Sequence, residues 1–102
     1  MKHTDNYYNN KVRSILKPIF DEIEAQYPGC TIYPYIVSWL RSNPYEKWVD
    51  FELCWTNKMN IRWSYMFVRT STYEKLYEII KNDKHLKENI LHAFKLKCLK
   101  IQ

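Results

Sequence analysis

Two carboxylates, Asp50 and Glu52, stand two positions apart in a segment of alternating polar and apolar residues. Side chains two positions apart in a strand share a face, where paired carboxylates can hold a magnesium ion for phosphodiester hydrolysis. Nuclease sites carried on strands usually add a lysine two residues later, and here that position is Cys54. We therefore expect no metal site, and we expect no cofactor.

A second set of residues has the types that metal-free RNA cleavage needs, namely an acid, a base and a phosphate clamp. Its members are Arg62, Tyr65, Arg69, His85 and His92. The two histidines are seven residues apart, and no spacing in the set singles out a site. A small metal-independent ribonuclease is thus an alternative, while the main expectation is a protein that is not an enzyme and has no catalytic residue.

Several chemical motifs are excluded by composition. The chain has one glycine, Gly29, so it cannot form the glycine-rich phosphate loops of nucleotide-binding proteins. Its cysteines, Cys30, Cys54 and Cys98, are odd in number and widely spaced. This pattern favours reduced, buried thiols over a disulfide framework or a zinc site.

The first element expected is a helix over residues 8–27, where apolar residues recur at intervals of three and four. Pro18 lacks a backbone donor, so it should kink this helix or start a second one. Residues 27–30 then read Tyr-Pro-Gly-Cys, and proline followed by glycine predicts a type II turn.

The middle of the chain predicts three strands. Residues 48–55 and 61–69 alternate in polarity and should form a hairpin with a three-residue loop at 57–59. That loop would pair Trp55 with Ile61, Leu53 with Trp63, Phe51 with Tyr65, Glu52 with Ser64 and Cys54 with Arg62. Residues 31–41 favour a strand that Pro34 confines to an edge, with a short helix beginning at Pro34 as the alternative.

Two helices should follow the sheet. Ser71 and Glu74 form a capping box at the start of one helix, and Asp83 can cap a second. The whole chain, residues 1–102, is therefore expected to be a single α+β domain. In it, an N-terminal helix, a three-stranded antiparallel sheet and two C-terminal helices are arranged with the helices packed on one sheet face.

Most of the net charge of +5 lies near the C-terminus, because residues 81–102 hold six lysines against Asp83 and Glu88. A basic helix can neutralise phosphates, which makes this segment a candidate nucleic-acid interface. The lysines considered are Lys84, Lys87, Lys95, Lys97 and Lys100. The alternative interpretation is that they keep a hydrophobic protein soluble.

Aromatic residues give the other candidate surface, since 17 of the 102 residues are Phe, Tyr or Trp. We expect Trp39, Trp48, Arg62 and Arg69 to anchor a protein interface on the sheet face opposite the helices. Rings beside guanidinium groups also bind single-stranded nucleic acid, and Arg41 could join them. Asp50 and Glu52 share that face and would repel phosphate, although simple cross-strand pairing with Arg62 is the preferred explanation of these carboxylates.

The order helix, three strands, helix over residues 7–81 resembles the double-stranded-RNA-binding domain in topology. That family contacts RNA partly through a lysine-rich start to its last helix and a loop between its first two strands. Here residues 71–75 carry one lysine beside a glutamate, and the loop at 42–46 has no glycine or histidine. The resemblance therefore implies no RNA-binding residue.

The leading hypothesis is a small non-catalytic inhibitor or adaptor that docks on a protein or nucleoprotein complex. Lys, Ile, Tyr and Asn, which have AT-rich codons, supply 39 residues, as expected of an AT-rich host or of a small phage or mobile-element gene. An anti-CRISPR protein is one example of such an inhibitor. No apolar run reaches the length of a membrane span and no signal peptide is visible, so a cytoplasmic protein without membrane contact is expected. A homodimer formed through an aromatic patch is a further hypothesis.

Overall fold

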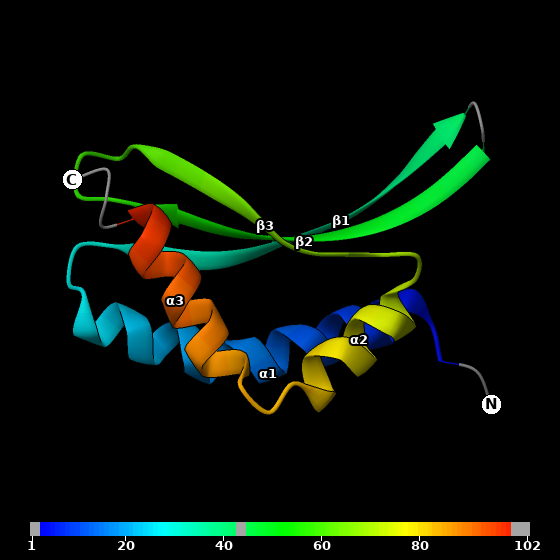
Figure 1. The fold of residues 1–102 in the computed structure, drawn as a ribbon, viewed down its shortest axis with the longest axis horizontal. Coiled ribbons are helices and arrows are strands. Elements are labelled where there is room, and N and C mark those ends of the chain that lie inside the picture. The colour runs from blue at the N-terminus through cyan, green and yellow to red at the C-terminus, as the bar shows by residue number, and fades with distance from the viewer. Residues whose placement is uncertain (1–2, 43–44, 99–102) are drawn as a thin grey trace.

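A computed structural model describes residues 3–42 and 45–98 of the chain. Among these residues, three helices lie on one side of a three-stranded antiparallel sheet, and none of them covers the other side (Figure 1). The elements are α1 (Asp5–Gln26), β1 (Thr31–Ser42), β2 (Tyr45–Thr56), β3 (Arg62–Thr70), α2 (Tyr73–Asn82) and α3 (Leu86–Cys98). The predicted α+β architecture is confirmed.

Helix α1 begins at a side-chain cap, because the hydroxyl oxygen of Thr4 accepts a hydrogen bond from the backbone N–H of Tyr7. The helix continues through Pro18, so no second helix begins there. Its buried stripe consists of Val12, Leu16, Phe20 and Ile23. Tertiary packing along this stripe compensates for the one backbone donor that the proline removes.

The turn after α1 has the predicted geometry. Gly29 adopts a φ of 96°, which glycine reaches without steric cost, and the N–H of Cys30 donates to the carbonyl oxygen of Tyr27. The chain then enters β1, which pairs along its whole length with β2, from Thr31 opposite Thr56 to Ser42 opposite Tyr45. The expected first strand is confirmed, and the alternative of a helix beginning at Pro34 is wrong.

The connection between β2 and β3 differs from the prediction. It has five residues, 57–61, instead of three, because the side-chain oxygen of Asn57 accepts hydrogen bonds from the N–H groups of Met59 and Ile61. Asn60 takes up the left-handed conformation in this loop. The register is consequently shifted by two residues from the predicted one, with Trp55 opposite Trp63, Leu53 opposite Tyr65 and Cys54 opposite Ser64. A shift of two keeps every side chain on its expected face.

A bulge in β3 changes the pairing farther along. Glu52 lies opposite Met66, but Phe51 lies opposite Val68, so that Phe67 is the extra residue. Without the bulge, Asp50 would pair with Val68, and Arg69 would point toward the helices. The bulge instead places Arg69 opposite Asp50, on the sheet face that the helices do not cover.

The core lies between the helix-facing side of the sheet and the three helices. Val49, Phe51, Leu53 and Trp55 of β2 are buried there. The helices contribute the buried stripe of α1, Leu76 and Ile80 from α2, and Leu86, Ile90, Ala93 and Phe94 from α3.

The cap of α2 is Thr72, whose hydroxyl oxygen accepts a hydrogen bond from the backbone N–H of Lys75, and not Ser71 as predicted. Asp83 accepts from the N–H of His85 just before α3, as expected of a cap.

Candidate functional site

The outer face of the sheet, meaning the face without helices, is lined by alternate residues of the three strands. β1 contributes Tyr33, Tyr35, Val37, Trp39 and Arg41; β2 contributes Glu46, Trp48, Asp50, Glu52 and Cys54; β3 contributes Arg62, Ser64, Met66 and Arg69. Tyr35 and Met66 are exposed, and Trp39 and Trp48 are half-buried although none of the helices α1 to α3 covers them. Side chains on this face therefore shield one another instead of packing into the core.

The side chains that shield one another surround an ion pair, Arg69 with Asp50, which is joined by two hydrogen bonds. Arg69 Nε donates to Oδ1 of Asp50 over 2.8 Å, and its Nη2 donates to Oδ2 over 3.1 Å. The carboxylate is almost completely buried, with 7% of its side chain exposed, whereas 47% of the arginine side chain is exposed. Bidentate pairing fixes the plane of the guanidinium as well as its position.

Two indole rings complete this arrangement, and we call Trp39, Trp48, Asp50 and Arg69 the arginine–tryptophan cluster. The indole N–H of Trp39 donates to Oδ2 of Asp50 over 2.7 Å. The guanidinium carbon of Arg69 lies 5.2 Å from the ring centroid of Trp39 and 5.7 Å from that of Trp48. Both distances are in the range of cation–π attraction.

The electrostatics of the cluster keep both charges in place. Hydrogen bonds from Arg69, and a further one from Trp39, hold the pKa of Asp50 below its usual value, although burial of the carboxyl acts in the opposite direction. The same pairing raises the pKa of Arg69. The guanidinium is thus oriented and locally neutralised, which suits a contact with protein better than capture of a phosphate.

Of the four predicted interface residues, three meet in the cluster and Arg62 does not. Arg62 lies at the opposite end of β3, opposite Thr56. The preferred explanation of the carboxylates, pairing with Arg62, is wrong. Because of the bulge and the shifted register, Asp50 lies opposite Arg69 and forms its ion pair with that residue. The outer face carries three arginines and three carboxylates, which are Arg41, Arg62 and Arg69 against Glu46, Asp50 and Glu52. Its formal charge is therefore balanced.

The predicted nucleic-acid-binding lysines do not share one environment. Lys87 forms an ion pair with Glu22 of α1, and the ammonium group of Lys97 lies 5.5 Å from the ring centroid of Tyr65. Lys84 and Lys95 are exposed, and the described part of the chain offers neither an ion-pair partner. Lys100 lies outside the described residues.

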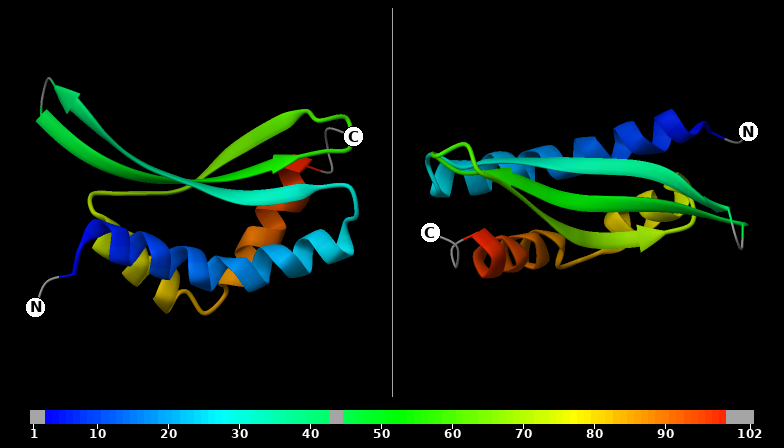
Figure 2. Two further views of the ribbon diagram at one scale, coloured as in Figure 1. Left: turned by 180° about the vertical axis from the view of Figure 1, so that it is seen from behind. Right: turned by 90° about the horizontal axis from the view of Figure 1, so that it is seen from above.

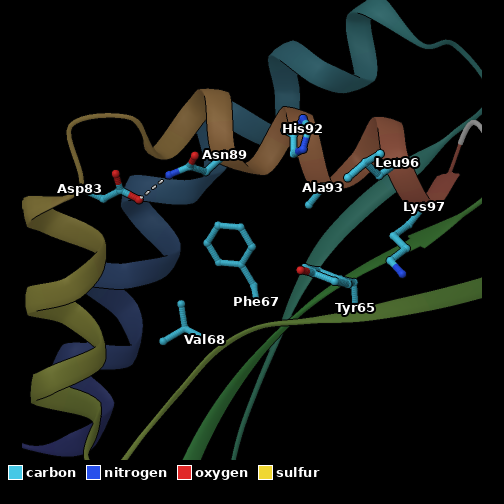
Figure 3. A pocket seen from close by; sticks show the side chains of 9 residues that line it. All are labelled: Tyr65, Phe67, Val68, Asp83, Asn89, His92, Ala93, Leu96 and Lys97. Carbon is cyan, nitrogen blue, oxygen red and sulfur yellow. Dashed lines mark hydrogen bonds between the residues drawn. The ribbon is translucent and has the colours of Figure 1, made fainter.

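The residues considered for RNA cleavage are divided between two places. Tyr65 and His92 line a cleft of about 550 Å³ between β3 and α3, together with Asn89 and Lys97 (Figure 3). Arg69 is held in the cluster on the outer face, and neither Arg62 nor His85 lines the cleft. The cleft therefore brings together two members of the proposed set, Tyr65 and His92, and a lysine, without the arginines of that set.

Asp50 is the site residue that the sequence did not identify as an anchor of the interface. The alternation of polar and apolar residues in β2 predicted that Asp50 lies on the outer face. Its partner, Arg69, depended on a bulge that no motif in β3 predicts. Cys54 is also buried on this face, and burial together with the nearby Glu52 raises the pKa of its thiol.

No protein-family model, curated protein or solved structure matches this chain. Within residues 3–42 and 45–98, no three His, Cys, Asp or Glu side chains form a group that could hold a metal ion. In the same stretches, no helix combines the length and the apolar character that crossing a membrane requires.

Proposed function

We propose that the chain is a non-catalytic binding protein, an inhibitor or adaptor, that docks on a protein partner through the outer face of its sheet. The observation that carries this proposal is the arginine–tryptophan cluster, in which a guanidinium held by Asp50 lies over two half-buried indoles on the sheet face opposite α1, α2 and α3.

The cluster has the composition and the rigidity of an interface anchor. Tryptophan and arginine are the residue types that most often dominate the energy of protein interfaces. Three hydrogen bonds to Asp50 hold Trp39 and Arg69 before any partner arrives, so that binding orders few additional side-chain torsions. The balanced charge of the outer face favours a protein over a polyanion.

The test is affinity purification of the tagged protein from its host cells at low and at high salt, with Trp48→Ala as the variant. Truncating an anchor should weaken binding by about 2 kcal/mol or more, roughly 30-fold, while the protein stays folded. Ile79→Ala is the matched control, because Ile79 is an exposed apolar residue on α2, on the other side of the molecule. We expect a stoichiometric protein that wild type and the control retain through high salt and that Trp48→Ala loses.

Two outcomes would contradict the proposal. Retention of the same protein by Trp48→Ala would remove the cluster from the interface. Nucleic acid that is bound at low salt and released at high salt would instead support the predicted lysines near the C-terminus, of which Lys84, just before α3, and Lys95, within it, have no ion-pair partner among the described residues.

A further inference from the structure

The free edge of β1 is protected along its first half. The backbone N–H of Ile32, which points away from β2, donates to a carboxylate oxygen of Glu24 over 2.7 Å. The carbonyl oxygen of Pro34 accepts from Nη1 of Arg13 over 3.4 Å, and the proline has no N–H to offer. Side chains of α1 and one proline thus block this half against further strand pairing.

The second half of the same edge has no such protection. Peptide groups in an antiparallel pair alternate in direction, so the outward orientation at Ile32 and Pro34 recurs at Ile36, Ser38 and Leu40. Within the described residues, no hydrogen bond reaches the outward N–H and C=O groups of these three positions. The other edge of the sheet, β3, carries the bulge, which is a common way of blunting an edge.

The unprotected half lies where a second chain can reach it. The hairpin of β1 and β2 rises away from the helices toward its turn (Figure 1). Leu40 is 58% exposed there, and Ser38, Trp39 and Leu40 line a hollow of about 530 Å³ with Tyr45 and Lys47. Trp39 belongs to both this hollow and the arginine–tryptophan cluster, so the edge is continuous with the proposed interface.

We propose that the edge of β1 at Ile36, Ser38 and Leu40 receives an extended segment of the protein partner as a fourth strand of the sheet. Main-chain hydrogen bonds to the outward peptide groups would give affinity, and alternate side chains would give specificity. This inference rests on the proposed function, because it states how the partner engages the same surface.

The chemistry of the edge defines the segment. On the outer face the added strand would lie beside Val37 and Trp39, and on the helix side beside Ile36 and Leu40, so apolar side chains are favoured on both faces. Arg13 lies at one end of the unprotected stretch and Arg41 at the other. An extended segment that is acidic at its ends and apolar between them is therefore complementary.

A second copy of this chain fits the edge less well. Seen from above the sheet, the N-terminal half of α1 extends beyond the edge of β1 (Figure 2, right). Two copies joined edge to edge by antiparallel β1 strands would place both α1 helices on the same side of the joint sheet. The projecting part of each α1 would then have to occupy the space beneath the other copy's β1. A single added strand, by contrast, lies above α1 and does not collide with it.

The experiment begins with two phage-displayed libraries of ten-residue peptides. One library has acidic residues at both ends and the other has basic residues there. Between the ends, both are randomised among β-branched, aromatic and polar residues. The tightest peptide from selection on the wild-type protein is then titrated calorimetrically into wild type, Ser38→Pro and Ser38→Ala. Proline removes an outward N–H that β2 does not use, and Pro34 shows that β1 accepts proline at this orientation. We expect enrichment from the acidic library, affinities of wild type and Ser38→Ala within about twofold, and a loss of about tenfold in Ser38→Pro.

A second measurement covers the case in which Ser38→Pro does not fold. N-methylation of each amide of the selected peptide in turn should weaken binding to wild type at every second position, which is the signature of strand pairing. Equal effects along the peptide, equal affinity for Ser38→Pro, or no enrichment of acidic peptides would overturn the inference. If these results occur while Trp48→Ala still loses the purified partner, the proposed function stands and only strand addition fails. A partner retained by Trp48→Ala contradicts the proposed function itself.

Discussion

The two sides of β2 differ although they alternate residue by residue along one strand. On the helix side, Val49, Phe51 and Leu53 are completely buried against α1, α2 and α3. On the outer side, Trp48 is half-buried and Asp50 almost completely buried, in both cases by neighbours on the same face. The first side obtains its burial from another layer of structure, and the second obtains it from an arginine and a second tryptophan.

This difference indicates how much each side contributes to folding. A side that is buried by helices contributes to the free energy of folding through the area removed from water. A side on which large rings remain half-exposed but are held in position contributes little to the core, and it is the side that we propose contacts a partner. The variants below separate these roles, because they act on neighbouring residues of the same strands.

The largest effect is expected from Phe51→Ala. Removing a completely buried ring leaves a cavity between the sheet and the helices, and the free energy of unfolding should fall by about 3–5 kcal/mol. Glu52→Ala is the matched control, since Glu52 is the next residue along β2 and points to the outer side; its effect should stay within about 0.5 kcal/mol. Urea denaturation followed by circular dichroism measures both values. Similar losses in the two variants would show that the outer side is as important for folding as the inner side.

An intermediate effect is expected from Arg69→Gln, which leaves the buried carboxylate of Asp50 without its bidentate partner. The double variant Asp50→Asn with Arg69→Gln removes the charge together with its partner, so its thermal midpoint should lie above that of the single variant. Thermal unfolding of the two proteins and of Asp50→Asn completes the cycle. Additive changes would mean that the two side chains act independently and that the cluster is not held by this pair.

The sequence predicted the architecture because the patterns that define it are local. Intervals of three and four marked α1, alternation marked β2 and β3, and proline with glycine at 28 and 29 marked the turn. Boundaries were less accurate, as the shift of the α2 cap from Ser71 to Thr72 shows. Several hydroxyls near a helix start can serve as caps, and tertiary packing decides among them.

The candidate site was predicted only as a set of residue types. Trp39, Trp48 and Arg69 were expected on one face, but their contact depends on the bulge at Phe67 and on the five-residue loop closed by Asn57. A bulge is the result of competition between alternative pairings of two whole strands, which no short window of sequence contains. The role of Asp50 as the centre of the cluster followed from that competition and could not be read from its neighbours.

Acid should weaken the outer side selectively. Because its partners lower the pKa of Asp50 in the folded protein, this carboxyl stabilises the fold fully above the pKa it has when unfolded, near pH 4. The stabilisation is lost as the pH falls through the lower, folded value. Between pH 5 and pH 2 the free energy of unfolding should therefore decrease more steeply in wild type than in Asp50→Asn. Parallel curves in chemical denaturation at several pH values would contradict the role given to this carboxylate.

The smallest effect is expected from Glu46→Gln, which removes the other ion pair on the outer face. Arg41 Nη1 and Glu46 Oε2 are 4.0 Å apart at the far end of the hairpin, and both side chains are accessible to solvent. An exposed pair gains little because water and salt screen it, so the free energy of unfolding should change by less than about 0.5 kcal/mol. Comparison with Arg69→Gln then measures what burial adds to an ion pair on one sheet face. If Glu46→Gln were as destabilising as Arg69→Gln, the cluster would owe its order to the hairpin as a whole and not to the buried carboxylate at its centre.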